Sequence, residues 1–516
     1  MSDYFSLVEG GGADIDCRRL EGGLAAVASN VDLYAPQAER YANTILQRFV
    51  YAETDRCSPK ATSIALGILK ALGRQTSGAS AVASQQAIGG LLELARTYYV
   101  PCDSADTTPY VSDICSDALT CIANAMLLHP ECRSRVAEHQ CLDNIAKILG
   151  ATNGDLTVEF LCARCLLLAL GTKEAAQYCV EQHGLQNVLA QTAQAALNAD
   201  GLTSAANSRF TPQQVLAEVL KAALSLCTYS LQWIHDTEPE SDSSFPQERA
   251  IEFAALLDVS LRVLCNSPLE AHHLSSAAKQ AVGIAMDFST NSSAEIRELW
   301  LPGMATLQNV DAIYDLLKGI VSHTTSESSE TGSCADNVIS EYQDELTPLA
   351  LVLTRLATEH PDARQRLFLA IYPEGTIDYS ELPENRPGLS AKLVRLMKTP
   401  HGGMLPGAIG DLLLALLGHD IKQFIMAVGY GNAAGYMVAR NIAIPSDIIE
   451  QVKQQDDESA SVDPITGRYW DQEGIDRELA SMTDEEKERE AERLFVLFER
   501  LNKTGVIKVE NPIRAA

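Results

Sequence analysis

The chain has 516 residues, 46% of them hydrophobic but only 6% aromatic, and its formal net charge at pH 7 is -28. One compact core does not extend over so long a chain, so we expect several domains or a repeat array. The negative charge argues against nucleic acid or an anionic membrane surface as a partner, because their phosphate groups would be repelled.

The first residues lack the basic and apolar regions of a secretory signal peptide, and Ser2 stands where N-myristoylation requires glycine. The apolar runs are also too short to cross a bilayer. The thirteen cysteines are odd in number and scattered, which favours reduced thiols in a cytoplasmic protein. Cys162 and Cys165 form a CxxC pair, but no second ligand pair follows. We therefore expect two buried helix positions there rather than a metal site.

The spacing of apolar residues predicts one amphipathic helix after another from about residue 35 to residue 440. Apolar residues recur every three or four positions, as at Ile64, Ile68, Leu69 and Leu72. No segment shows the strict alternation of a half-buried strand, so we predict an all-α fold. The other helical stretches are 82–98, 156–170, 212–234, 247–265, 270–287, 308–321, 340–358 and 406–427.

One helix-breaking motif between these helices is repeated. HPECRSR (His129 to Arg135) recurs as HPDARQR (His360 to Arg366), with a looser copy at Asn266 to Pro268. In each case proline ends one helix, and an acidic residue lies in the first turn of the next. Helix pairs of about 40–45 residues are typical of armadillo and HEAT arrays. We therefore predict an α-solenoid superhelix whose concave face binds a partner.

The predicted solenoid spans 35–440, after an N-terminal segment at 1–34. Ser-, Thr- and acid-rich inserts interrupt it at His235 to Glu248 and Ser322 to Asn337, and another insert lies at Tyr372 to Gly388. A flexible acidic linker is expected at 441–481, followed by an amphipathic helix at 482–503 and a tail at 504–516. Thr483 and Glu486 form a capping box at the start of that helix.

Motifs for catalysis and cofactor binding are missing. There is no GxxxxGK[ST] loop for nucleotide, no GxSxG elbow and no HExxH helix. Gly429, Gly431 and Gly435 do not match the dinucleotide fingerprint, and no strand is predicted before them. We interpret them as a tight turn with close helix packing. The sequence predicts no enzyme, no catalytic residue, no cofactor and no metal.

The last third of the chain carries three specific motifs in a fixed order. They are VGYGNAAGY (Val428 to Tyr436), DPITGR (Asp463 to Arg468) and TDEEKEREAERLFVLFERL (Thr483 to Leu501), preceded by NRPGLSAKLVRLMKTP (Asn385 to Pro400). In sequence and spacing these segments resemble the synembryn family. That resemblance implies an exchange factor and folding chaperone for heterotrimeric G-protein α subunits. It also implies an armadillo/HEAT solenoid that captures the α subunit's C-terminal helix and stabilises the nucleotide-free state.

The resemblance also implies which residues bind the partner. In the family, basic and amide side chains of early repeats meet the captured helix and its terminal carboxylate, and this matches Lys70, Arg74 and Asn124, with Phe160 as a weaker aromatic match. Lys70 and Arg74 are four residues apart, which places them on one face of a helix. Without the resemblance, the same two cations are an ordinary solvated face. The apolar stripe of the final helix would clasp the partner through Leu494, Phe495 and Phe498.

The implied partner is a GDP-bound or nucleotide-free α subunit without βγ, bound by a monomer that α subunits recruit to the cell cortex. Relatives carry phosphorylated acidic segments, whereas Ser459 and Ser461 here are not followed by the acidic residues that an acidophilic kinase requires. Two alternatives stay open. One is a generic armadillo adaptor or scaffold, although the three tryptophans are not spaced as repeats. The other is a G-protein regulator that binds without promoting exchange.

Overall fold

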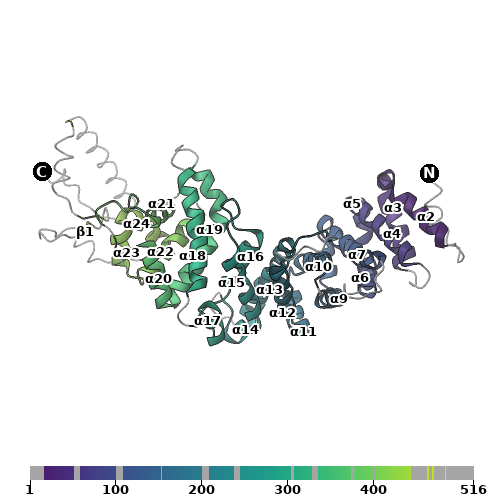
Figure 1. The fold of residues 1–516 in the computed structure, drawn as a ribbon, viewed down its shortest axis with the longest axis horizontal. Helices are drawn as coiled ribbons and strands as arrows, with labels where there is room; N and C mark the ends of the chain where they lie inside the picture. Colours follow the sequence, from purple (N-terminus) through teal and green to yellow (C-terminus); the bar gives the residue numbers. More distant parts are fainter. Residues whose placement is uncertain are drawn as a thin grey trace. The chain divides into compact units, whose positions relative to one another are not determined.

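The computed structural model describes residues 17–51, 58–99, 109–152, 154–199, 208–237, 244–303, 307–327, 335–373, 377, 379–398, 403–442, 462–463, 468–469 and 483. The chain forms two compact units, residues 1–375 with 395–419 and residues 376–394 with 420–516. Apart from two strands of two residues each, the regular structure of the described residues is helical (Figure 1), which confirms the all-α class.

Helical structure begins before residue 35, where the sequence pattern predicted its start. The first elements are α2 (Cys17–Ala28), the 3-10 helix η1 (Val31–Gln37), α3 (Ala38–Ile45) and the π-helix η2 (Leu46–Val50). Helix α2 packs against α4 (Pro59–Leu72) and fully buries Leu24 and Val27. The segment 17–28 therefore belongs to the packed first unit.

After α4 the helices follow one another in groups of three. Each group has a short first helix, a second helix and a third helix. The first helices are α5 (Thr76–Val82), α8 (Cys132–Val136), α11 (Lys173–His183), α14 (Gln247–Glu252), α17 (Ala294–Trp300) and α20 (Pro361–Ile371). The second helices are α6 (Gln85–Tyr98), α9 (His139–Ala151), α12 (Leu185–Asn198), α15 (Ala254–Asn266) and α18 (Gln308–Glu327). The third helices are α7 (Pro109–Leu128), α10 (Leu156–Ala169), α13 (Pro212–Thr237), α16 (Ser276–Ala285), α19 (Ala335–Glu359) and α22 (Leu405–Leu416).

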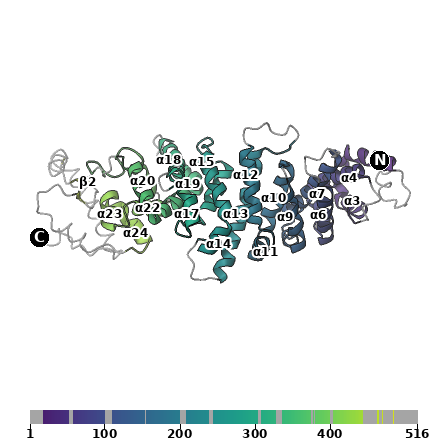
Figure 2. The ribbon, with the colours of Figure 1, turned by 60° about the horizontal axis from the view of Figure 1, so that its bottom comes forward.

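Equivalent helices of successive groups stack on one another, which makes the first unit a solenoid (Figures 1 and 2). Helices α4, α7, α10, α13, α16, α19 and α22 each contact the next and form what we call the third-helix layer. Helices α6, α9, α12, α15 and α18 do the same in a second-helix layer. The repeat contains three helices, as in armadillo arrays, and the predicted helix pairs are wrong in this respect. The first helices have only five to eleven residues, too short for a clear period.

The repeated HPxxRxR motif marks equivalent places in the array. His129 precedes α8, and His360 precedes α20, and both helices are the first of their group. The looser copy instead begins at Asn266, the last residue of α15, and lies between the second and third helices of one group. That copy therefore does not mark a repeat boundary.

Side-chain caps determine where several third helices begin. Ser58 accepts a hydrogen bond from the Ala61 amide at the start of α4, and Asp155 accepts from the Thr157 and Val158 amides at the start of α10. Thr211 and Gln214 form a reciprocal capping box before α13. These caps satisfy amides that have no partner within the helix.

Two predicted inserts differ in their extent. Helix α18 continues to Glu327 and α19 begins at Ala335, so both ends of the insert at Ser322 to Asn337 are helical. Helix α13 continues to Thr237, into the insert that begins at His235. Among the helices that the structure describes, none is both long and apolar enough to cross a membrane.

The second unit contains α23 (Ile421–Val428), α24 (Tyr430–Ala439) and part of α21 (Leu389–Met397). Gly429, with a φ of 79°, forms the turn between α23 and α24, as predicted. A Cβ added at Gly431 or Gly435 meets no described atom within 4 Å, so close packing is not their role. Strands β1 (Val462–Asp463) and β2 (Arg468–Tyr469) pair antiparallel within the segment predicted as a linker.

Candidate functional site

The third-helix layer contains acidic side chains that are buried against cations from the neighbouring helix. On α7, the Asp117 carboxylate accepts a hydrogen bond from the Lys70 ammonium of α4, and the two side chains are 9% and 23% exposed. Burial raises the pKa of Asp117 above its ordinary value, and the hydrogen bond from Lys70 opposes that rise. The predicted partner-binding Lys70 is therefore already engaged by an acid of its own chain.

A second buried acid joins the next two third helices. Glu218 on α13, whose side chain is 2% exposed, accepts from the guanidinium of Arg164 on α10. The Lys221 ammonium lies 3.2 Å from the other carboxylate oxygen of Glu218. Two cations thus surround one carboxylate, which leaves a local excess of positive charge in a chain of net charge -28.

Phe160, the predicted groove aromatic, lies on α10 one turn before Arg164. Its ring stacks on Phe210 with 3.8 Å between centroids and 12° between planes. The Arg164 guanidinium carbon is 5.1 Å from the Phe160 centroid, within cation–π range. Phe160 and Phe210 are both half-buried, so together they offer an aromatic surface with part of its area open.

Asn124 lies on α7, seven residues after Asp117 and therefore near the same face of that helix. Its side chain is half-buried and makes no hydrogen bond to another residue of the described part. A half-buried amide carries two donors and an acceptor that need partners. Asn124 is thus able to hydrogen-bond the backbone of a bound peptide.

Arg74 does not share a helix with Lys70, contrary to the predicted helical face. Helix α4 ends at Leu72, and Arg74 lies in the following turn, where its amide donates to the Ala71 carbonyl. Gly73 caps the end of α4, where its amide donates to the Leu69 carbonyl. The Arg74 side chain is exposed.

Three of the sequence-predicted residues, Lys70, Asn124 and Phe160, therefore lie on consecutive helices of the third-helix layer, with Arg74 just beyond α4. The remaining three, Leu494, Phe495 and Phe498, lie outside the described residues. The structure adds Asp117, Arg164, Phe210, Glu218 and Lys221 to the same surface. The spacing of Asp117 from Asn124 and of Arg164 from Phe160 follows the helical period, and it could have indicated those two residues.

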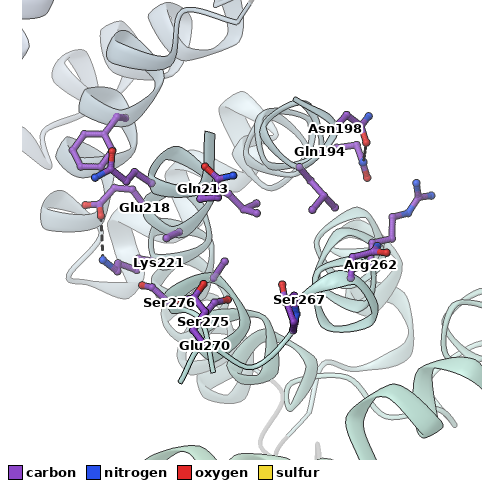
Figure 3. Close-up of a pocket in the computed structure, with 18 of the residues that line it drawn as sticks. Gln194, Asn198, Gln213, Glu218, Lys221, Arg262, Ser267, Glu270, Ser275 and Ser276 are labelled. Carbon is purple, nitrogen blue, oxygen red and sulfur yellow. Dashed lines mark hydrogen bonds and ion pairs between the residues drawn. The ribbon is translucent and has the colours of Figure 1, made fainter. Parts of the chain in front are cut away.

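A pocket of about 890 Å³ continues this surface beyond Phe160 and Arg164 (Figure 3). It is lined by the ends of α12 and α15, the starts of α13 and α16, and amide side chains are frequent in its wall. In Figure 3 the Glu218–Lys221 ion pair lies on one side, while Gln194 and Asn198, which share a hydrogen bond of 2.8 Å, lie on another. Polar and apolar side chains share the wall, and its frequent amide groups suit a peptide better than a purely apolar ligand.

The geometry of a metal or thiol site is not found in the described part of the chain. No group of three or more His, Cys, Asp or Glu side chains there is placed to hold a metal ion. Cys162 and Cys165 are free and fully buried on α10, which confirms their interpretation as core positions. Burial raises the pKa of the Cys165 thiol to about 12, so this thiol is protonated at neutral pH.

A family model and relatives from several organisms match this chain, and all of them belong to one family. A family model described as guanine nucleotide exchange factor synembryn (Ric8) matches residues 65–516. The protein named chaperone Ric-8A of Macaca fascicularis is 32% identical over 174 residues, and its counterpart of Gallus gallus is 29% identical over 176. These matches cover 32% and 33% of this chain and 32% of either relative, so they span about a third of the length of each.

A synembryn-like chaperone of Schizosaccharomyces pombe is 22% identical over 435 residues, covering 78% of this chain and 75% of that protein. The crystal structure of an engineered protein matches 88% of this chain and 96% of that chain at 13% identity, with a TM-score of 0.44, a similarity too weak to carry an argument. The family match extends over most of the sequence and includes α7, α10 and α13 of the candidate site. The chain therefore belongs to the Ric8 family, the guanine nucleotide exchange factor synembryn family.

Proposed function

We propose that this protein is a guanine nucleotide exchange factor and folding chaperone for heterotrimeric G-protein α subunits. The observation that carries the proposal is family membership over residues 65–516, together with the chaperone names of the relatives. The partner is an α subunit without βγ, either GDP-bound or free of nucleotide. The protein acts as a cytoplasmic monomer that α subunits recruit to the cell cortex.

The candidate site supports capture of the α subunit's C-terminal helix along the third-helix layer. Asn124 supplies an amide without a hydrogen-bond partner among the described residues. The stacked rings of Phe160 and Phe210 supply an aromatic contact for apolar side chains, and Lys70, Arg74, Arg164 and Lys221 supply positive charge. Aromatic and Arg side chains are the residues that most often dominate a protein interface.

Exchange then requires no catalytic nucleophile. Withdrawal of the C-terminal helix disturbs the nucleotide-binding loop that leads into it, so GDP dissociates from the α subunit. The factor promotes this only because it binds the empty state more tightly than the nucleotide-bound state. A preference of about 10⁴-fold, roughly 5.5 kcal/mol, converts a 1:99 population into 99:1. A surface that holds an open α subunit also accounts for chaperone action.

We propose that the C-terminal segments form a second contact with the α subunit. We place the linker at 441–481, and we assign the amphipathic helix at 482–503 to a second contact through Leu494, Phe495 and Phe498. That helix would bind the α subunit's nucleotide-binding core. Truncation after residue 481 should weaken binding of an intact α subunit while leaving binding of its isolated C-terminal helix unchanged.

The direct test is GTPγS uptake by a purified GDP-loaded α subunit, with and without this protein. An α subunit that lacks its C-terminal helix serves as the control. Acceleration that disappears with the truncated subunit supports exchange by helix capture. If the protein binds several α subunits but accelerates uptake by none of them, it is a chaperone or an inhibitor and not an exchange factor. If the protein neither binds an α subunit nor accelerates uptake, it is instead a generic armadillo adaptor.

A further inference from the structure

Between helices α15 and α16 the chain makes a tight turn whose two central residues have an unfavourable backbone. The amide of Glu270 donates to the His273 carbonyl at 2.8 Å, and the amide of His273 donates to the Glu270 carbonyl at 2.9 Å. Ala271 and His272 lie between them with φ of 47° and 72°. Such a turn is usually made with glycine or asparagine, because other side chains clash with the backbone at positive φ. The turn is therefore strained, and contacts with its surroundings hold it in place.

Contacts with helix α18 hold one side of the turn. The His272 ring stacks on the His323 ring, with 3.8 Å between centroids and 10° between planes. One helical turn earlier, a Cβ added at Gly319 would lie 2.5 Å from the Leu269 side chain, so Leu269 packs directly on the backbone of α18. From α19, the Tyr342 ring meets His323 edge-on at 6.1 Å. His272 is exposed and His323 is half-buried, so both imidazole rings can exchange protons with solvent.

Contacts with helix α19 hold the other side of the turn. The Leu274 amide donates to Glu345 Oε2 at 2.7 Å, and His273 Nδ1 lies 2.9 Å from Glu345 Oε1. The His273 ring also stacks on Tyr342 with 4.5 Å between centroids, and its Nε2 atom is 3.6 Å from a Glu341 carboxylate oxygen. Because the Glu345 side chain is only 3% exposed, this anchor is largely shielded from water.

The two adjacent histidines have opposite charge environments. His273 faces two carboxylates of α19, which the Lys279 ammonium of α16, 2.8 Å from Glu345, offsets only in part. His272 faces another imidazole instead. Imidazole is the side chain that gains a positive charge between pH 8 and pH 5. A proton on His273 therefore strengthens its contact with α19, whereas protons on both His272 and His323 place two like charges 3.8 Å apart.

The segment around this turn belongs to the wall of the pocket beside the candidate site (Figure 3). Ser267, Glu270 and Ser275 line that pocket of about 890 Å³. Ser267 and Pro268 also line a second pocket of about 580 Å³, between α15 and α18. The other charged side chains in the wall of the first pocket are Arg164, Glu218, Lys221 and Arg262. A displacement of the turn would therefore change the shape of both pockets.

We propose that the turn from Glu270 to His273 is a pH-sensitive flap. Near pH 8, where imidazole is uncharged, the rings of His272 and His323 stack and the flap lies on α18. When both rings are protonated, their repulsion and the strain of the turn act together, so His272 leaves α18 while His273 stays on α19. Ala271 and His272 then leave positive φ, which breaks the two hydrogen bonds between Glu270 and His273.

The direction of the pH dependence follows from proton binding. The closed flap, with its rings stacked and uncharged, binds fewer protons than the open flap, so opening is favoured as the pH falls. The closed state is therefore fully populated at high pH and is lost on acidification. No α subunit takes part, so the flap goes beyond the proposed function and does not depend on it.

The test follows the imidazole Cε1–H signals of the full-length protein by NMR between pH 8 and pH 5.5, together with hydrogen exchange of the turn amides. The chain has only ten histidines, so H272N and H323F identify the two signals. H272N supplies a residue that tolerates positive φ but does not titrate. H323F keeps an aromatic ring on which a protonated His272 can still rest. His139 is the internal control, because it stacks on the phenol ring of Tyr178 at 3.7 Å.

We expect the cross-ring contact between His272 and His323 to be lost as the pH falls, while the contact of the control stack persists. Protection of the Glu270 and His273 amides, corrected for the intrinsic exchange rate, should fall about tenfold from pH 8 to pH 5.5. In H272N and H323F, protection of these amides should not depend on pH.

Three results would overturn the flap. One is a stack of His272 on His323 that persists in the wild type at pH 5.5. Another is an equal loss of protection in H272N and H323F, because the pH response would then come from other groups. The third is a loss of protection at the Leu274 amide as large as that at Glu270, since the whole segment would then unfold.

Discussion

The guanidinium of Arg164 on α10 and the carboxylate of Glu218 on α13 form an ion pair across two successive third helices, and the Glu218 side chain is only 2% exposed. The same relationship recurs at Lys70 and Asp117 between α4 and α7. It recurs again between α16 and α19, where the Lys279 ammonium lies 2.8 Å from a Glu345 side chain that is 3% exposed. Buried acids thus fix the stacking of the third-helix layer at every second interface from α4 to α19.

Removal of one partner of such a pair should destabilise the solenoid. In Glu218→Ala the cations Arg164 and Lys221 lose their acid, and we expect the free energy of unfolding in urea to fall by about 3 kcal/mol. Glu252→Ala is the control, because Glu252 pairs with Arg249 on the surface at 3.0 Å and exposed pairs contribute roughly 0.5 kcal/mol. Equal urea midpoints for the two variants would show that the buried pair has no special role.

Asn124 should contribute to partner binding but not to stability. Its half-buried amide makes no hydrogen bond within the described part of the chain, so Asn124→Ala should leave the thermal midpoint unchanged. Affinity for the α-subunit helix should fall roughly tenfold, through one or two lost hydrogen bonds. Gln177→Ala, which removes an amide from α11, is the control for a residue outside the third-helix layer. A drop in midpoint without a change in affinity would contradict the assignment.

Gly78 marks the closest approach of two helices near the candidate site. A Cβ added there would lie 2.6 Å from the carbonyl carbon of Leu72 at the end of α4. Since this neighbour is backbone, Gly78→Ala should displace α5 and cost about 2 kcal/mol. Gly89→Ala on α6 meets open space and should instead stabilise its helix by roughly 0.5–1 kcal/mol. Thermal unfolding of the two variants, which should shift in opposite directions, tests the close approach.

Asp287 should make stability depend on pH. Burial raises its pKa to about 7, with Arg355 opposing the rise, and its Oδ2 atom has no hydrogen-bond partner among the described residues. Because the folded state holds this proton up to about pH 7 and the unfolded state releases it near pH 4, stability should fall as pH rises between these values. The fall is up to roughly 4 kcal/mol, from about three pKa units.

Asp287→Asn removes this titration and is therefore expected to flatten the pH dependence. The difference in unfolding free energy between wild type and variant should shift in favour of the variant from pH 5 to pH 8. Asp258→Asn is a suitable control, since Asp258 lies on the surface in an ion pair with Arg262. Parallel pH profiles for wild type and Asp287→Asn would show that the carboxyl titrates at its ordinary pKa.

The helices themselves were largely predictable from local pattern. The stretch 340–358 kept its helical period through Pro348, and α19 runs through that residue. The stretches 82–98 and 156–170 correspond closely to α6 and α10. The helical period appears as apolar residues three and four positions apart, a local pattern that can be seen in the sequence. The short first helices α5, α11 and α17 lie almost entirely outside the predicted stretches, because seven to eleven residues carry too few periods.

The candidate site was predictable only in part. Lys70, Asn124 and Phe160 came from the family resemblance, and the structure places them on consecutive third helices. It also shows what the resemblance did not, namely that Lys70 is bound to Asp117 and that Arg74 lies beyond the end of α4. Both facts follow from packing between helices and not from residue type.

The sequence by itself determined the all-α class and the family, because helical period and the motifs of the last third are local properties of the chain. Tertiary structure alone decided the three-helix repeat and the partners of each charge. Lys70 and Asp117 are 47 residues apart, and Arg164 and Glu218 are 54 apart. Contacts over such separations depend on how helices stack, which is set by the shape of the whole buried surface between them.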